Sequence, residues 1–513
     1  MSEKGSEYSS ENESTLVTPI ETTKPVWPLV TPRTRKELYH TIIKYNYCVF
    51  PISLGLTFCR KYSRFIIRIT QREDVLTRRY VVLWKLAYVT NRYQNAVAVD
   101  NQWNWATILQ TSLLFFGLLA QMPPYVSVWS LCMPMRPGSH AQGPAKRDFR
   151  SLRVCLVTKG TNFDTVIRAT RAWAPMQNIP GVRFHVLLDD ETKEVEFRQA
   201  LPSFVQIVVV PSAFTPSKAK YKARALEYYR RNQQLGSGDW VLHLDEESMI
   251  DEAVMEACIN SITKSDIDMF MISVEKVVDE RVEQGTLHYN DVNHWKNGFL
   301  STAETLRSQE DFGKFSFSVR MRNKPMLGWM HGSWILINGA VENATTWDTD
   351  CQAEDFWFAY NSSAKGYKFG WIWDPVHEQP NETFQDFWKQ RRRWYTGILS
   401  IPSIIVQFSL VVSVIGELVY WIGPIYTQLG GSFIIPKWLF IWGLWHFTVD
   451  THSLLVASFM SDLTAPEGVT WLQTVQHAIQ TVLLAPIVRL VQVSALVTCI
   501  FNPAKGFAIV SKK

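Results

Sequence analysis

Long apolar stretches near the C-terminus set the strongest constraint on what this chain can fold into. They lie at about 398–420, 433–460 and 471–501, and an earlier one runs from about 105 to 131. A membrane-spanning helix needs roughly 20 mostly apolar residues, a length that all four stretches reach. A shorter stretch at 45–59 is marginal. We therefore expect a protein that is partly membrane-embedded, and the sequence leaves the number of spans open.

The composition is typical of a soluble domain combined with membrane segments. Only 19% of the residues are charged, against about 25% in an average soluble protein. The 21 tryptophans are a residue type that favours membrane–water interfaces. The basic region at 60–104 has the pattern of a segment that lies flat on lipid headgroups. If both early apolar stretches spanned the membrane, this region would lie opposite a cytosolic central domain, so one of the two is expected to be re-entrant or interfacial.

Charge and cysteine usage exclude other classes. The net charge of +5 is modest and no basic stripe with interleaved aromatic residues is present, so nucleic-acid binding is not predicted. The seven cysteines form no CxxC pair, which indicates buried, reduced thiols and fits a cytosolic central domain. Residues 1–28 are rich in Ser, Thr and Glu and predict a disordered tail, with no cleavable signal peptide.

The central region, about 145–395, alternates β-branched runs with helical patterns. Strands are predicted at 153–158, 184–188, 205–210 and 240–244, and helices at 164–173 and 218–231. Such alternation predicts a mostly parallel sheet with helices on both faces. Ligands of these sheets bind beyond the carboxyl ends of the strands, where the acidic residues of this chain fall. The usual glycine-rich dinucleotide and NTPase phosphate loops are absent from the sequence.

The sharpest motif is an apolar strand that runs directly into three acids, Asp245, Glu246 and Glu247. Alternate residues at a strand end project to the same side, so Asp245 and Glu247 can converge. Two carboxylates at one point suit Mg²⁺ or Mn²⁺, ions that usually also contact substrate phosphates. The alternative is an ordinary polar loop after a strand.

Two weaker motifs follow. Gln390, Arg393 and Trp394 form a QxxRW pattern just before an apolar stretch. Arg393 could bind diphosphate oxygens and Trp394 could stack on a sugar, although a basic run beside a membrane also binds lipid headgroups. Asp355, in Ala353-Glu354-Asp355, could accept a proton from an acceptor hydroxyl. Its alternative role is that of an acid at a helix N-terminus.

Taken in order, these motifs resemble those of glycosyltransferase family 2: an acidic strand end, a DxD-type pair, ED and QxxRW. The likeness covers roughly residues 150–400. Within the family, the sequence resembles the egghead-type β-1,4-mannosyltransferases, which transfer mannose from GDP-mannose to a glucosyl lipid. The resemblance implies a GT-A fold, that is, an α/β, Rossmann-like, mostly parallel sheet, in a cytosolic domain with flanking transmembrane and interfacial helices.

The resemblance also implies roles for individual residues. Asp189 or Asp190 contacts the nucleotide, with Asp190 favoured, and Lys222 and Arg224 lie where the family has cationic contacts to the diphosphate. The remaining implied roles are metal binding for Asp245 and Glu247, proton abstraction for Asp355, donor contacts for Gln390 and Arg393, donor and acceptor contacts for Trp394, and acceptor contacts for Gly332 and Ser333. Glu247 replaces an aspartate found in many family members, but the egghead-type proteins share it.

A single base implies a single displacement with inversion, which gives a β-linked product. The alternatives are a processive β-polysaccharide synthase that uses a UDP-sugar and extends a growing glycan, and a non-enzymatic transporter or scaffold. Asp450 and His452 are the only pair that hints at transport, and they could instead cap or break a helix. His377 is interpreted as a structural hydrogen-bonding residue. His243 is interpreted as a residue that lies in the core or packs next to the acids.

The expected organisation has four parts. Residues 1–28 form a tail, 29–144 an N-terminal membrane and interfacial region, 145–397 the GT-A domain and 398–513 a C-terminal transmembrane region. The expected partners are a nucleotide-sugar donor, a glycolipid or growing glycan acceptor and the lipid membrane. The Golgi, the endoplasmic reticulum and the plasma membrane all suit this pattern, with the catalytic domain on the cytosolic side.

Overall fold

The computed structural model describes residues 32–49, 51–53, 123–133, 149–263, 280–412 and 437–504, together with a few isolated positions. The predicted tail, the basic region at 60–104 and parts of the apolar stretches at 45–59 and 105–131 lie outside these residues.

In the described part of the chain, seven strands form one mixed sheet in the order β3-β2-β1-β4-β6-β5-β7. The strands are β1 (Ser151–Thr158), β2 (Val182–Leu188), β3 (Val205–Val209), β4 (Asp239–Asp245), β5 (Arg281–His288), β6 (Trp334–Asn338) and β7 (Lys368–His377). Strands β3, β2, β1 and β4 are parallel, and β5 is parallel to β7. Only β6 runs antiparallel to its neighbours β4 and β5.

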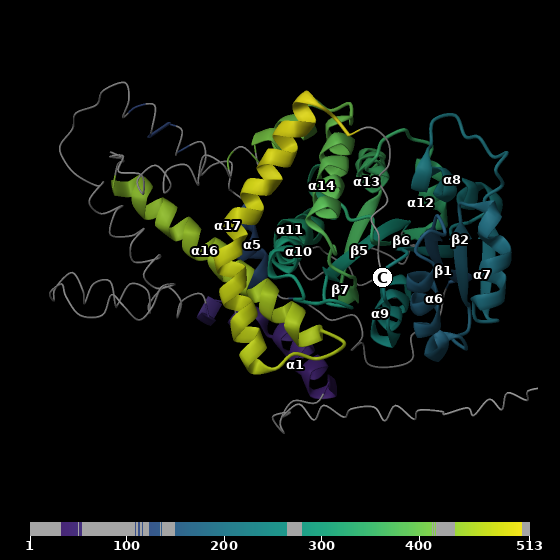
Figure 1. Ribbon diagram of the computed structural model, residues 1–513, viewed down its shortest axis with the longest axis horizontal. Helices are drawn as coiled ribbons and strands as arrows, with labels where there is room; N and C mark the ends of the chain where they lie inside the picture. Colours follow the sequence, from purple (N-terminus) through teal and green to yellow (C-terminus); the bar gives the residue numbers. More distant parts are fainter. Residues whose placement is uncertain are drawn as a thin grey trace, which may run out of the picture.

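Helices cover both faces of this sheet (Figure 1). They are α6 (Phe163–Ala172), α7 (Glu194–Ala200), α8 (Tyr221–Gln233), α9 (Glu252–Thr263), α10 (Gly298–Glu310), α11 (Ser316–Arg322), α12 (Gly339–Thr345), α13 (Glu354–Ala364) and α14 (Phe384–Leu399). Alternate residues of β1 face opposite sides, so Val154 and Leu156 pack in one core cluster and Cys155 and Val157 in the other. The expected mostly parallel α/β sheet is therefore confirmed.

Two long C-terminal helices, α16 (Lys437–Thr464) and α17 (Trp471–Phe501), pack on the same domain (Figure 1). They contact α10, and α17 also contacts α14. The helices α1 (Pro32–Lys44) and α5 (Pro123–Cys132) complete this side. One hydrophobic cluster includes Tyr39, Leu131, Trp373 and Met460, and so joins the N-terminal helices, the sheet and α16.

Among the described residues, α17 is the one helix long and apolar enough to cross a membrane, and 39% of its most apolar window is buried in the protein. Its outward side carries exposed apolar residues along the whole helix, among them Leu472, Ile487 and Phe501. The sequence predicts several membrane spans, whereas the described residues contain one candidate helix. The remaining candidate stretches lie partly outside the described residues.

Asp450 and His452 lie inside the continuous helix α16, so the expectation that they cap or break a helix is wrong. Asp450 forms a two-fold ion pair with Arg489 of α17, at 2.6 and 2.7 Å. His452 Nε2 lies 2.7 Å from Ser53 Oγ. These buried polar groups connect helices to one another, as expected for structural residues.

The described cysteines contain no disulfide. Cys155, Cys258, Cys351 and Cys499 are buried free thiols. Burial raises the pKa of the Cys258 thiol well above its usual range. Cys48 is exposed and Cys132 half-buried, so the described cysteines are free thiols as predicted, but the expectation that they are buried is wrong for these two.

Candidate active site

A cavity of about 560 Å³ lies at the carboxyl ends of β1, β2 and β4. Its walls come from these strand ends, from α13 and α14, and from α17. The carboxyl ends of parallel strands leave such a crevice because the following loops diverge there. The position agrees with the site that the sequence predicts.

The three acids after β4 all line this cavity. Asp245 is fixed through its backbone N–H, which donates to Ser333 O at 2.9 Å. Glu246 accepts a hydrogen bond from Thr158 Oγ1 at 2.7 Å and another from Asn162. Burial, with the nearby charge of Glu247, raises the pKa of Glu246 to about 7. β4 ends at Asp245 and Glu247 lies in the following turn, so the predicted strand alternation does not extend to Glu247, although both residues line the cavity.

Lys222, near the start of α8, lies among the acids. Its Nζ is 2.5 Å from Asp245 Oδ1, 2.9 Å from Gly332 O and 3.5 Å from Glu354 Oε1. Burial opposes the charged form, but the carboxylates of Asp245, Glu354 and Asp355 raise the pKa of Lys222 above its usual value. The cluster thus already holds one positive charge in place, and its hard oxygen donors fit a divalent cation as well.

Glu354 and Asp355 begin α13. Burial raises the pKa of both carboxyls, and the charges of Lys222 and Arg393 oppose that rise. Asp355 Oδ1 accepts the backbone N–H of Phe356 at 2.8 Å. The carboxylate therefore has a fixed orientation and a proton affinity above that of an exposed aspartate, as a general base requires.

Gly332 and Ser333 also lie on the cavity wall. A Cβ added at Gly332 would lie 2.8 Å from Asp355 Oδ2, which is closer than real Cβ atoms come. The carbonyl of Ser333 accepts hydrogen bonds from the Asp245 backbone and from Ser248 Oγ, the latter at 2.8 Å. The segment predicted to contact the acceptor therefore holds the Asp245 backbone and approaches the Asp355 carboxylate closely.

This contact predicts that Gly332→Ala lowers kcat, because the new methyl group displaces the Asp355 carboxylate. A displacement of about 1 Å at a reacting group costs roughly 10²-fold. Gly236→Ala is the matched control, since its added Cβ meets no atom closer than 3.6 Å. Rates and unfolding temperatures of both variants check this prediction, and a Gly332→Ala enzyme with wild-type kcat would contradict it.

The residues predicted to contact the nucleotide separate in the structure. Asp189 lines the cavity, whereas Asp190 caps the following 3₁₀ turn by accepting from Thr192 N at 3.0 Å. Arg224 forms an ion pair with Asp189 and donates to the carbonyl of Pro211 at 2.7 Å. The geometry thus favours Asp189 over Asp190 for the nucleotide contact, and it makes Arg224 the residue that orients Asp189.

The QxxRW residues lie on α14, and all three line the cavity. Gln390 Oε1 accepts a hydrogen bond from Asn381 at 2.9 Å. Two guanidinium groups lie over the Trp394 ring, Arg307 at 4.3 Å and Arg391 at 4.2 Å from its centroid. Such cation–π contacts fix the indole, so Trp394 forms a rigid part of the cavity wall.

Arg307 is a site residue that the sequence analysis missed. It lies on α10, its nearest acid is Glu304 at 3.7 Å, and it lines the cavity. Burial and the charge of Arg391 lower its pKa to about 10. A buried, weakly paired guanidinium is well suited to bind phosphate oxygens. In the sequence it follows the helical pattern of α10 far from any motif, so no local signal distinguished it from a surface arginine.

Part of the cavity lining is apolar. Phe315 and Trp329 are stacked with ring centroids 6.0 Å apart, and Leu410 and Val414 belong to the hydrophobic cluster against which Trp329 packs. Arg489 and Gln492 of α17 also line the cavity. One continuous space therefore connects the acids after β4 to the helix with an exposed apolar side.

Two histidines have the structural roles that the sequence predicts. His377 Nδ1 lies 2.7 Å from Asn290 Oδ1. His243 Nε2 lies 2.9 Å from Glu342 Oε1, with its side chain only 2% exposed. Neither lines the cavity, although Glu378, next to His377, does.

The position of Lys222 predicts a pH effect. A base acts when it is ionised, so the rate falls as the pH drops through the pKa of Asp355. Replacing Lys222 by methionine removes a nearby positive charge, which raises this pKa further and moves the acid limb of the kcat/KM profile to higher pH. Lys220→Met, at an exposed position, should leave the limb in place. An acid limb shared by wild type and Lys222→Met would contradict the assignment.

The chain is similar in sequence to known glycosyltransferases. The family model "Glycosyl transferase family group 2" matches residues 240–499, which is half of the chain. Curated relatives include Beta-1,4-mannosyltransferase bre-3 of Caenorhabditis elegans, 30% identical over 203 residues, and Beta-1,4-mannosyltransferase egh of Drosophila melanogaster, 29% identical over 203 residues. Each match covers 38% of this chain and 41% of the relative.

Among solved structures, the mannosyltransferase PcManGT of Pyrobaculum calidifontis aligns with 13% identity and a TM-score of 0.38, covering 77% of this chain and 98% of that one.

Proposed function

Since this chain belongs to glycosyl transferase family group 2, we propose that it is an inverting, metal-dependent enzyme that transfers mannose from GDP-mannose to a glycolipid. Family membership confirms the resemblance and the enzyme class drawn from the motifs. The observation that supports the finer proposal is the single cavity that joins the acids after β4 to α17. The mannosyltransferase names of the curated relatives support the choice of mannose.

Asp245 and Glu247 would hold the divalent cation, Mn²⁺ or Mg²⁺, because they are the paired hard ligands at the strand end. The cation would neutralise charge on the diphosphate of the donor. Lys222, which contacts Asp245 at 2.5 Å, keeps the same carboxylate oriented. Arg307 and Arg393 line the cavity and bind the departing diphosphate.

Asp355 takes the proton from the acceptor hydroxyl. The hydroxyl oxygen forms a bond to the anomeric carbon while the bond from that carbon to the phosphate oxygen breaks, and the nucleoside diphosphate leaves with the electron pair. Attack from the face opposite the leaving group converts an α-linked donor into a β-linked product. The half-buried carboxylate with its raised pKa suits this role.

The acceptor sugar enters past the apolar part of the cavity lining, and α17 anchors the enzyme at the lipid surface where such a headgroup lies. The catalytic domain faces the cytosol in this proposal. Three asparagines of glycosylation sequons, Asn343, Asn361 and Asn381, donate side-chain hydrogen bonds within the fold, and on the cytosolic side they stay unmodified. Asn381 is only 3% exposed. A glycan at Asn381 would contradict this placement.

The donor test supplies the full-length protein in lipid nanodiscs with glucosylceramide, Mn²⁺ and labelled GDP-mannose, UDP-glucose or UDP-N-acetylglucosamine in turn. Addition of one mannose per lipid is the expected result. A long polymer made from a UDP-sugar would instead establish the processive synthase. Equal transfer with and without a chelator would refute the metal requirement.

A further inference from the structure

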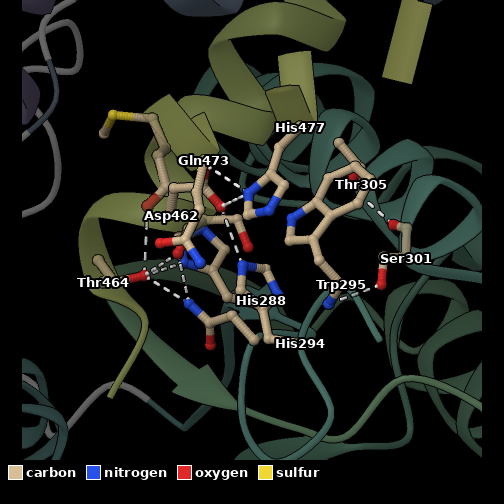
Figure 2. A network of polar contacts seen from close by, with 12 residues as sticks. His288, His294, Trp295, Ser301, Thr305, Asp462, Thr464, Gln473 and His477 are labelled. Atoms are coloured by element: carbon tan, nitrogen blue, oxygen red, sulfur yellow. Dashed lines mark hydrogen bonds and ion pairs between the residues drawn. The ribbon is translucent and has the colours of Figure 1, made fainter. Parts of the chain in front are cut away.

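A second cluster of metal-ligand side chains lies outside the catalytic cavity (Figure 2). His294 belongs to the loop after β5, Asp462 lies near the end of α16, and His477 lies in the second turn of α17. Two consecutive helices and a loop more than 160 residues earlier in the chain thus each contribute one side chain to the same point. Neither the proposed reaction nor the family motifs use any of them.

The donor atoms are already close together. His294 Nε2 lies 2.9 Å from Asp462 Oδ1, and His477 Nδ1 lies 3.0 Å from both Asp462 oxygens. All three ligand atoms lie within 4.8 Å of one another. Donors bound to one tetrahedral Zn²⁺ at about 2.0–2.1 Å lie about 3.3 Å apart. The distances from Asp462 to the two histidine nitrogens are within about half an ångström of that separation, so small movements of these side chains would admit the ion.

The surroundings hold the ligands in place. The side chains of Asp462 and His477 are 2% and 8% exposed. The ring of Trp295 stacks on His477 with centroids 4.3 Å apart and an interplanar angle of 11°. Rigid, largely dehydrated ligands lose little entropy when they bind an ion, which favours a defined site over a chance contact.

We propose that His294, Asp462 and His477 form a binding site for a borderline divalent cation of the zinc type. Two imidazoles and one carboxylate are a usual donor set for Zn²⁺, with a fourth position left for water. The buried Asp462 carboxylate has no lysine or arginine within ion-pair distance among the described residues. A cation between the three groups balances that charge, which is otherwise costly to bury.

The site would connect the C-terminal helices to the catalytic strand ends. Asn290, in the same loop as His294, donates to Ser461 O at 2.6 Å and pairs with His377 Nδ1 at 2.7 Å. Glu378 follows His377 and accepts from Ser248 Oγ at 2.6 Å. Ser248 closes the acidic motif after β4. The cation is thus a structural staple that holds α16 and α17 against the loop supporting the catalytic acids.

The test uses variants that keep the hydrogen bonds but remove the metal ligands. In His477→Asn the amide nitrogen takes the approximate place of Nδ1, and in His294→Gln it takes that of Nε2. Both amides still donate to Asp462, but neither is a good zinc ligand. All proteins are full length, in detergent, and carry Asp245→Asn so that an ion at the catalytic acids does not contribute.

Zinc content is measured by mass spectrometry after treatment with a chelating resin, together with the rise in unfolding temperature on adding Zn²⁺. The parent should hold about one zinc per chain, and both variants should lose the zinc and the temperature rise. His185→Asn is the matched control, because this buried histidine pairs with Tyr229 at 2.8 Å away from the cluster; it should retain zinc.

A parent protein without zinc and without a zinc-dependent temperature rise would overturn the proposal. Full zinc content in either isosteric variant would also overturn it and would leave the cluster as a hydrogen-bonded triad. Neither readout depends on sugar transfer, so failure of the proposed reaction would be recognised separately.

Discussion

Asp355→Asn should lower kcat by about 10²–10⁴-fold, the contribution of a positioned general base. Asparagine has nearly the same shape and can still accept the Phe356 N–H that orients Asp355, so the fold should persist. It cannot take a proton from the acceptor hydroxyl. Donor binding depends on other residues, and KM for the nucleotide sugar should therefore change little.

The control for this variant is Asp164→Asn, at an exposed position in the first turn of α6. It should retain wild-type kcat. Initial rates under saturating donor and acceptor, with unfolding temperatures of both variants, provide the comparison. If Asp355→Asn kept more than a tenth of the wild-type kcat, another group would have to be the base.

The second large effect is expected at the strand end. Asp245→Asn and Glu247→Gln should each lower kcat/KM by about 10³-fold, because a metal ion supplies several kcal/mol of charge stabilisation and each 1.4 kcal/mol is a factor of ten. Asp245→Asn also removes the carboxylate that Lys222 contacts at 2.5 Å. In both variants the Mn²⁺ concentration for half-maximal rate should rise.

Glu252→Gln tests whether any acid near β4 has this effect. Glu252 is exposed in the first turn of α9 and should show the wild-type Mn²⁺ dependence. Rates measured across a Mn²⁺ series, with GDP-dependent thermal stabilisation as an independent binding readout, distinguish the cases. An unchanged Mn²⁺ requirement in Asp245→Asn would place the metal elsewhere.

The first four strands could be predicted because each is a local apolar run of the right length. Their observed bounds differ from the predicted ones by at most two residues. The antiparallel strand β6 could not be placed, because it inserts beside β4 about 90 residues later in the chain and its position depends on tertiary packing. The same holds for β5 and β7, which pair across a long helical insertion.

The candidate site was predictable where motifs are short and local, and not where helices bring distant residues together. Asp245, Glu247, Asp355 and Trp394 all line one cavity, as their order in the family motifs implied. Arg307 lacked such a signal. Asp189 and Asp190 are adjacent, and only the cap formed by Asp190 shows which of the two faces the cavity.

The sequence pattern also did not predict that the C-terminal helix α17 contributes residues to the cavity. Apolar length predicted membrane spans, and α17 has that length. Periodicity gave no sign that Arg489 on the same helix lines the cavity at the strand ends while pairing with Asp450. A buried ion pair between two apolar helices is specified by packing partners that a single sequence does not reveal.

The stereochemistry of the product tests the central claim most directly. The full-length enzyme would be supplied with GDP-mannose, Mn²⁺ and glucosylceramide, and the anomeric configuration of the new linkage would be determined by NMR. A single displacement assisted by Asp355 predicts one β-linked mannose. An α-linked mannose would contradict the account, because retention requires a second displacement or a different face of attack.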